Sequence, residues 1–537
     1  MDKREHLLKM IKHLVSIPSI SESKEENLPC LWIYDRLIKK EYFVKHPENI
    51  QIIETPLEGS DQKLKALLVT VKSERKTTKT ILFISHFDVV SNDIYGEIKE
   101  YAFDCDKLSS YFNNKDNDTL YGRGTMDMKA GVALEVDLIE DFADDTKMFD
   151  VNIIVAFVGD EENTSAGMRR LIPVLSKMKS EGTEFLVAIN TEPGEAGCSG
   201  ENGPMVFTGT LGKIMPAFYA KGLASHVGDP YKGFSSALYI SKLICEAEGN
   251  PKLTDGQKGK MQPSWVCLDV GTTRENYSVT IPDEAYAYFN CFTVTQTPYD
   301  VMAQMKKIAR KSFVAVNEQY KSSFDKISIE GFNGSSYSKN EVKIFTLEEI
   351  INKAKENNKY FEKEIKEYIK KIPSGDMRKR GIKIAQKICE ISAEKAPYVL
   401  CFFLPPWMPG RMTKTDNDKD KIIIDSVCEV KNNLLEKHNI EMKEIELFGG
   451  LCDLSYVGAK VNRESASLIG NNIPGWGELY SFDVEKMNDL GMPVINMGPS
   501  GSDPHNRNER LNLKYSIEIL PSLLRDLVKT IAKNTGK

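Results

Sequence analysis

The sequence lacks the features that mark several large classes of protein. Its ten cysteines include no Cys-x-x-Cys pair, so neither a disulfide framework nor a zinc knuckle is predicted, and free thiols in a reducing cytoplasm are expected. No apolar stretch is long enough to span a bilayer. The net charge of −6 gives no electrostatic argument for binding nucleic acid or an anionic membrane.

The remaining composition is that of a globular protein. A chain of 537 residues with 41% hydrophobic and 28% charged residues is too long for one core and predicts at least two domains. Residues 2–15 carry apolar side chains at helical spacing, so we expect an amphipathic helix there and not a signal peptide. The sequence contains no internal repeat and no long low-complexity tract.

Short apolar runs alternate with helical stretches in the first part of the chain. Four runs rich in β-branched residues, 64–71, 78–85, 151–158 and 184–190, are separated by helical patterns such as Lys129 to Ala143. This alternation predicts an α/β domain with a mainly parallel sheet covered on both faces. Ligands of such sheets bind beyond the carboxyl ends of the strands.

Acidic residues and histidines gather at those predicted strand ends and in two glycine-containing loops. They are His86, Asp88, Asp127, Glu161, Glu162, Glu192 and His505. Each has an ordinary explanation when taken alone: a core histidine, a helix N-cap, an acidic turn or a loop histidine. Together, two histidines and several carboxylates suit zinc, or a pair of divalent ions that promotes hydrolysis.

The spacing within this set suggests separate roles. Asp88 lies two residues after His86, which returns to the same face of a strand, so Asp88 can orient the site. Glu161 and Glu162 are adjacent acids that repel each other unless a cation or shared proton relieves them. One can therefore bind metal while the other takes a proton from water.

The pattern changes after about Pro204, where alternating strands and two helices, near 235–249 and 299–321, predict an α+β insert of order β-α-β-β-α. A Lys- and Glu-rich helix near 338–371 is typical of a solvated surface element. We therefore predict a discontinuous catalytic domain, 1–207 and 375–537, and an inserted domain, 208–374.

Five motifs carry a resemblance to a known family. They are "ISHFDVV", "GRGTMDMKAGVA", "VGDEENTSAG", "INTEPG" and "PHNRNERL", and they resemble the co-catalytic dizinc exopeptidase and deacylase family, which includes aminoacylase, acetylornithine deacetylase, succinyl-diaminopimelate desuccinylase and glutamate carboxypeptidases. The chain length, "PPWMPG" and "GGLCDLSYV" are similar to its arginine utilisation (RocB) branch.

The resemblance implies a fold and a role for each candidate. It implies a three-layer α/β/α catalytic domain with an inserted α+β lid that often dimerises, and two zinc ions, with cobalt or manganese as alternatives. Asp127 would bridge the ions, Glu161 would be the general base, and Asp88 would support a ligand. His226 would stabilise the oxyanion, often from a partner subunit. The implied metal ligands are His86, Asp127, Glu162, Glu192 and His505.

One departure from the family pattern concerns the substrate. Many relatives carry an arginine that grips a substrate carboxylate, but Phe292 stands where it is expected. A bidentate clamp for a free α-carboxylate is therefore not predicted here. Arg274 and Asn276 are the candidates for replacing that contact.

These observations predict a cytoplasmic metal-dependent hydrolase of an amide or peptide bond. Its substrate would be a small molecule or short peptide, used in arginine or other amino-acid catabolism. One alternative is a catalytically silent, metal-stabilised binding or regulatory protein, and another is a one-metal hydrolase. Retention of Glu161 with all five ligand positions argues against the silent protein, which has no physical need for a base.

Overall fold

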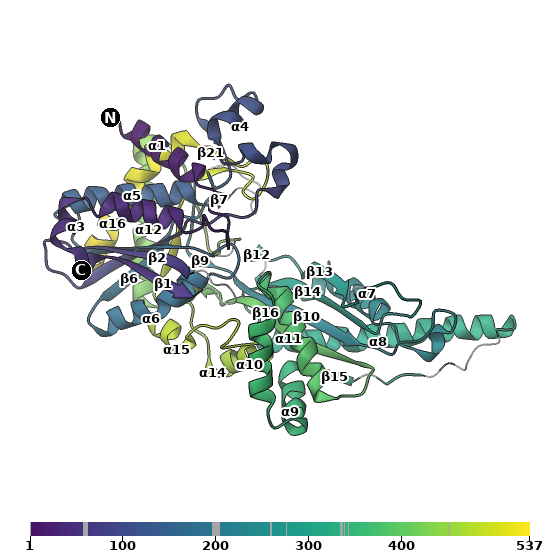
Figure 1. Cartoon of the computed structure of the whole chain (residues 1–537). Helices are drawn as coiled ribbons and strands as arrows, with labels where there is room; N and C mark the ends of the chain where they lie inside the picture. The colour runs from purple at the N-terminus through teal and green to yellow at the C-terminus, as the bar shows by residue number, and fades with distance from the viewer. Residues whose placement is uncertain are drawn as a thin grey trace. The chain divides into compact units, whose positions relative to one another are not determined.

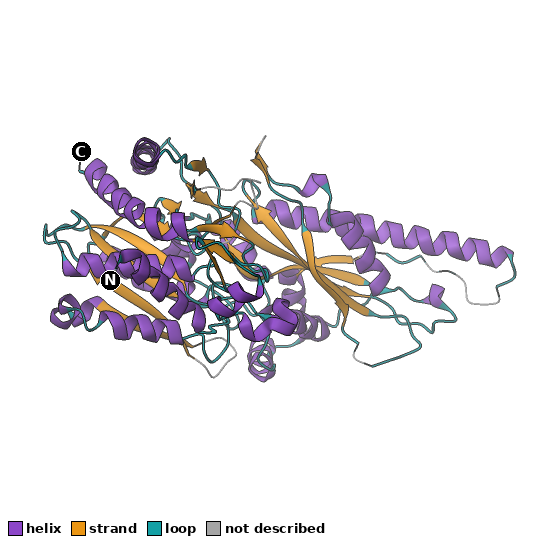
Figure 2. Ribbon diagram, turned by 90° about the horizontal axis from the view of Figure 1, so that it is seen from above, coloured by secondary structure: helices purple, strands orange, loops and turns teal. Residues whose placement is uncertain are grey.

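The computed structural model describes residues 2–56, 63–195, 204–257, 260–274, 276–332, 337, 339–341, 343–450 and 452–536. The chain forms two compact units, each built around its own sheet (Figures 1 and 2). Unit 1 comprises Met1–Leu211, Pro409–Lys460 and Phe482–Lys537, and unit 2 comprises Gly212–Met408 and Val461–Ser481. Within the described residues, no helix is both long and apolar enough to cross a membrane.

Unit 1 contains an eight-stranded sheet of order β1-β2-β5-β3-β6-β19-β8-β18. Its four central strands β5, β3, β6 and β19 run parallel, whereas β1 and β2 pair antiparallel with each other and β2 pairs antiparallel with β5. The predicted parallel pairing is therefore found in the centre of the sheet, whereas β1 and β2 form an antiparallel edge. The strands are Ile50–Pro56, Lys63–Val71, Asn152–Val158, Lys79–His86, Glu184–Asn190, Val494–Asn496, Met205–Phe207 and Lys443–Ile445, in sheet order.

Helices cover both faces of this sheet, which confirms the predicted three-layer arrangement. Helix α5 (Lys129–Asp144) packs on β2, β3 and β5, with α1 (Lys3–Ser16) and α16 (Leu520–Thr535) against it. Helices α6 (Ala166–Ser180) and α15 (Val484–Leu490) lie on the other side (Figure 1). Neighbouring residues of β3 are buried on both sides of the sheet, as expected for a strand that reads as a continuous apolar run.

A small sheet of order β4-β21-β20-β7 lies in the same unit. Its strands β20 (Ser500–Ser502) and β21 (Arg510–Asn512) are antiparallel neighbours. The loop between them contains His505, whose φ of 63° lies in the left-handed region. The remaining elements of unit 1 are α2 Leu28–Leu37, α3 Glu41–Lys45, α4 Cys105–Tyr111, β4 Thr119–Tyr121, β7 Gly194–Glu195, β9 Gly209–Thr210, β17 Arg411–Met412, α12 Asp418–His438 and α13 Ser455–Gly458.

Unit 2 contains a five-stranded sheet of order β13-β14-β10-β16-β15. Strand β10 (Gly212–Lys221) is followed by α7 (Ser236–Ala247), β13 (Val266–Thr272), β14 (Glu284–Thr293) and α8 (Pro298–Ile329). This succession has the predicted β-α-β-β-α order. The other elements are β11 Gly256–Gln257, β12 Lys260–Met261, β15 Lys343–Thr346, α9 Leu347–Asn357, α10 Phe361–Lys371, α11 Met377–Ser392, β16 Tyr398–Met408 and α14 Arg463–Asn472.

The boundary predicted at residue 375 differs from this division of the chain. Strand β16 is buried along its whole length and pairs antiparallel with β10, so the chain remains in unit 2 until Met408. Residues 461–481 return to unit 2 as well. The boundary predicted at 375 places the apolar run of β16 in the catalytic domain, because sequence alone does not reveal a strand's partner.

The charged region predicted over 338–371 forms two helices, α9 and α10, instead of one. Each buries an apolar stripe: Leu347, Ile350 and Ala354 in α9, and Phe361, Ile365 and Ile369 in α10. These helices are therefore amphipathic parts of unit 2, not fully solvated elements. Residues 338 and 342 of this region, and residue 451 of the "GGLCDLSYV" motif, lie outside the described residues.

Candidate metal centre

The candidate ligands of unit 1 lie beyond the carboxyl ends of the parallel strands of its main sheet. His86 is the last residue of β3, Glu161 and Glu162 follow β5, and Glu192 follows β6. Because these three strands are adjacent and parallel, their carboxyl ends bring the three segments together. Asp127 joins them from the turn before α5, and His505 from the loop between β20 and β21.

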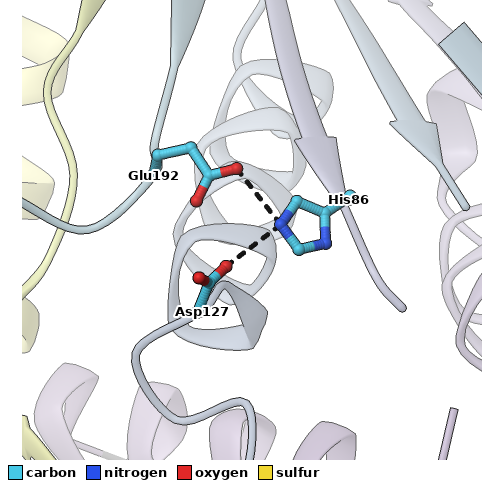
Figure 3. A group of neighbouring side chains, drawn as sticks. All are labelled: His86, Asp127 and Glu192. Atoms are coloured by element: carbon cyan, nitrogen blue, oxygen red, sulfur yellow. Dashed lines mark hydrogen bonds and ion pairs between the residues drawn. The ribbon is translucent and has the colours of Figure 1, made fainter. Parts of the chain in front are cut away.

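Three of these side chains form a first group that can hold a metal ion. Nε2 of His86 lies 3.1 Å from Oδ1 of Asp127 and 3.1 Å from Oε1 of Glu192 (Figure 3). One ligand atom of each residue lies within 4.8 Å of the others. Both His86 and Glu192 are buried, so this group is shielded from water.

A second group shares one residue with the first. Nε2 of His505 lies 3.1 Å from Oδ2 of Asp127 and 3.2 Å from Oε1 of Glu162. The two oxygens of Asp127 thus face different histidines, as a carboxylate that bridges two cations must. The His505 side chain is 50% exposed, so the second group lies nearer to solvent than the first.

Asp88 fixes the orientation of the His86 ring. Nδ1 of His86 lies 3.1 Å from the backbone oxygen of Asp88, and because a carbonyl only accepts, Nδ1 carries the proton. In a neutral ring, Nε2 then presents a lone pair to two carboxylate oxygens that are also acceptors. A cation between them removes this repulsion, so the donor set fits a metal ion.

The carboxylate of Asp88 also holds the acidic turn after β5. Its oxygens accept the backbone N–H groups of Glu161 and Glu162, each at 3.2 Å, and the hydroxyl of Ser21 at 2.7 Å. The side chain of Glu161 extends towards the first group, with Oε2 3.9 Å from Nε2 of His86. Glu161 is therefore close to the first group without belonging to it.

Burial and neighbouring charges shift the pKa values of the site residues. Burial, the carboxylate of Asp127 and nearby charges raise the pKa of Glu192 to about 8. Burial also raises the pKa of Glu161 well above its usual value, as do the charges of Glu192, Asp453 and Glu162. Burial opposes the protonation of His505, but Asp127 and Glu162 outweigh it and raise its pKa to about 12. The metal-free protein thus retains protons where cations would otherwise balance the carboxylates.

The other predicted site residues belong to unit 2. His226 is exposed in the loop after β10, where its Nδ1 accepts the N–H of Gly228 at 3.1 Å. Arg274 donates to the backbone oxygen of Thr280 at 2.9 Å and pairs with Asp283 at 3.4 Å. Asn276 is exposed, and Phe292 is half-buried in β14. The first and second groups therefore consist of unit 1 residues only.

Several residues around the site were not predicted from the sequence. Glu135 in α5 accepts hydrogen bonds from Ser85 and Thr191, the residues that precede His86 and Glu192. A charged residue among the apolar positions of this helix was the available signal for it. The others are Arg123 and Glu509, which form a buried ion pair, and Asp453, whose buried carboxylate oxygens have no hydrogen-bond partner among the described residues.

The chain is similar to known proteins along most of its length. The sequence model of Peptidase family M20/M25/M40 matches residues 82–530, a range that contains every member of both groups. The chain is 29% identical to the uncharacterized protein YqjN of Bacillus subtilis (strain 168), over 99% of this chain and 97% of YqjN. It is 23% identical to protein RocB of the same strain, over 98% of this chain and 94% of RocB.

A solved structure shows the same fold. The di-peptidase Dug1p from Saccharomyces cerevisiae covers 98% of this chain, with 96% of its own chain matched, at a TM-score of 0.56 and 12% sequence identity. This likeness extends across both units and supports the fold alone.

Proposed function

The chain belongs to peptidase family M20/M25/M40 and is a metal-dependent hydrolase of amide or peptide bonds, and from this premise we propose that it is an exopeptidase or N-acyl amino acid deacylase that uses two divalent ions. The observation that carries the proposal is the shared carboxylate of Asp127, whose two oxygens lie 3.1 Å from His86 and 3.1 Å from His505.

The two groups define how the ions would be held. His86 and Glu192 would bind one ion and Glu162 and His505 the other, with Asp127 common to both. Imidazole and carboxylate donors suit zinc, with cobalt and manganese as alternatives. Bound ions of this kind lower the pKa of water and polarise a carbonyl oxygen.

Glu161 is the proposed general base. It lies beside the first group but is not a member of it, so its carboxylate can take a proton from water and return it to the leaving nitrogen. The hydrogen bonds from its backbone and that of Glu162 to Asp88 hold the turn in place. Glu162 contributes to the second group while its neighbour transfers the proton.

The substrate proposed is a dipeptide or N-acyl amino acid used in amino-acid catabolism, with arginine metabolism suggested by the resemblance to the RocB branch. Phe292 replaces the usual carboxylate-gripping arginine, and Arg274 is already engaged by Thr280 and Asp283. We therefore propose no bidentate arginine clamp at the position of Phe292 for a free α-carboxylate of the substrate.

We also propose that unit 2 forms a homodimer through its edge strand β13. Val266, Leu268 and Val270 are 43%, 51% and 53% exposed on this strand, and an exposed apolar edge favours pairing with a second chain. His226 would then act as oxyanion donor in the partner's site.

A substrate panel tests the proposed activity. Metal-free protein is loaded with zinc, manganese or cobalt and assayed against N-acyl amino acids and dipeptides, with release of the free amine as the readout. We expect hydrolysis of at least one class with a metal preference. A protein that binds two ions but hydrolyses no member of the panel would favour the silent binding protein, and full activity with one ion would favour the one-metal hydrolase.

A further inference from the structure

We propose that the buried pair Arg123–Glu509 is a positioning unit that holds Asp127 and His505, and so affects the affinity for the second ion more strongly than the affinity for the first. This inference rests on the proposed two-ion site. Arg123 precedes Asp127 in the turn before α5, and Glu509 follows His505 in the loop between β20 and β21. The pair thus joins the two chain segments that carry Asp127 and His505.

Both carboxylate oxygens of Glu509 and both terminal nitrogens of Arg123 have hydrogen-bond partners. Oε1 of Glu509 accepts the backbone N–H of Met126 at 3.1 Å and of Asp127 at 3.3 Å. Oε2 of Glu509 accepts from Nη1 of Arg123 at 2.6 Å. Nη2 of Arg123 donates to the backbone oxygen of His505 at 3.0 Å. One continuous chain of contacts therefore runs from the backbone of Asp127 to that of His505.

Burying both charged groups of this pair costs free energy. The side chains of Arg123 and Glu509 are 1% and 0% exposed, and withdrawing two charges from water largely offsets their mutual attraction. A buried ion pair is thus a weak source of stability but a precise constraint on geometry, since both guanidinium nitrogens are directed by a rigid plane. The constraint matters most for His505, because its half-exposed side chain has little packing to hold it.

The first ion's ligands have a different constraint. Glu135 accepts from Ser85 at 2.7 Å and from Thr191 at 2.9 Å, which links the strand ends that carry His86 and Glu192. Glu135 thus supports the segments that carry two of the first group's three residues, whereas the Arg123–Glu509 pair contacts His505, which only the second group contains, and Asp127, which both groups share. Loss of the Arg123–Glu509 pair is therefore expected to weaken the second ion's site more than the first, because His86 and Glu192 keep the support of Glu135.

The test is a cobalt titration of metal-free protein, read by visible absorption and by calorimetry. The variants are Arg123→Gln, Arg123→Lys and Glu509→Gln. We expect two ions per chain in the parent, and in the variants a first ion bound at close to the parent affinity and a second bound about 10 to 100-fold more weakly. Arg123→Lys is expected to lie between, because one ammonium group cannot make both contacts. It also supplies a milder change if Arg123→Gln does not fold.

Arg525→Gln is the matched control. Arg525 joins α16 to Asp137 and Asp141 of α5 at 2.7 Å and 2.6 Å, so its loss removes a largely buried ion pair from the same unit. We expect both cobalt affinities to be unchanged in this variant. Parent-like binding of both ions in the folded Arg123 and Glu509 variants would overturn the inference, as would equal weakening of both ions. A parent that binds no second ion would instead overturn the proposed function.

Discussion

Oδ1 of Asp88 accepts the backbone N–H of Glu161 at 3.2 Å. The residue that orients His86 therefore also anchors the proposed base. The base and the first group are linked through one buried residue, because the backbone oxygen of Asp88 contacts the His86 ring and its carboxylate holds the turn that carries Glu161. Three kinds of substitution can therefore be compared: one that removes the base, one that removes a metal ligand, and one that weakens the contacts of Asp88.

Replacing the base should remove hydrolysis without removing metal. In Glu161→Gln we expect kcat to fall about 10² to 10⁴-fold, the usual contribution of a positioned base, with two ions retained by elemental analysis. Glu181→Gln, at the exposed end of α6, is the control and should keep parent activity. Near-parent turnover in Glu161→Gln would show that another group takes the proton.

Replacing a ligand should remove metal as well as activity. His86→Ala deletes the only imidazole of the first group, so we expect metal content to fall from about two ions per chain to one or fewer, together with activity. His438→Ala, in the last turn of α12, is the control. Elemental analysis after dialysis measures the result, and an unchanged metal content in His86→Ala would contradict the assignment.

Weakening the anchor should give an intermediate result. Asp88→Asn keeps the size of the side chain, but its amide nitrogen cannot accept a hydrogen bond, so one of the two contacts with the backbone N–H groups of Glu161 and Glu162 is lost. We expect kcat to fall about 10-fold or more while metal affinity falls 10 to 100-fold, the range for groups that orient metal ligands. Steady-state kinetics and metal titration measure the two effects. If neither changed, the contacts of Asp88 would be unnecessary for the site.

Glu135 predicts a pH dependence of stability. Burial raises its pKa to about 8, although Ser85 and Thr191 oppose this. A carboxyl group with a raised pKa in the folded state favours folding below its unfolded pKa, and that contribution is lost as pH rises to about 8. Glu135→Gln is therefore expected to be more stable than the parent at pH 9, by a free energy of unfolding on the order of a few kcal/mol, and this difference is expected to shrink towards pH 5.

The measurement is thermal unfolding of the metal-free protein and the variant between pH 5 and pH 9. Glu97→Gln, an exposed acid in the segment after β3, is the control and should follow the parent at every pH. A constant difference between Glu135→Gln and the parent across this range would show that Glu135 keeps an ordinary pKa.

The proposed dimer predicts complementation between two inactive variants. If His226 serves the partner's site, a mixture of His226→Ala and Glu161→Ala chains should recover about a quarter of parent activity, because half of randomly mixed dimers contain one complete site of two. Adding Leu268→Lys to both chains should charge the edge of β13, separate the dimer and abolish the recovery. Activity assays with light scattering measure both; absence of recovery in mixed dimers would place the histidine's action within one chain.

Local patterns predicted much of unit 1 because strand order and ligand order coincide there. The runs that became β3, β5 and β6 were evident from their β-branched residues, and the acids beyond them followed from the chemistry of strand ends. Which oxygen of Asp127 faces which histidine was not predictable, since it depends on a turn and a loop distant in the sequence. The roles of His226, Arg274 and Asn276 remain predictions.

Other features depended on partners that a linear pattern does not reveal. Strand β16 has the composition of any buried strand, and only its pairing with β10 assigns it to unit 2. Glu509 lies within a motif already singled out, but its contact with Arg123 joins residues separated by most of the chain. Buried polar contacts of this kind are specified by three-dimensional packing and not by periodicity.

The division of unit 1 into three stretches of chain bears on its biosynthesis. The first group is encoded completely by the time Glu192 has left the ribosome, whereas β19, which lies between β6 and β8, and His505 are translated only after unit 2. A nascent chain therefore carries an open sheet and four of the five candidate metal ligands throughout the synthesis of unit 2. Domains tend to fold in the order in which they are synthesised. Here the main sheet of unit 1 is completed only when β19 has been synthesised, after unit 2.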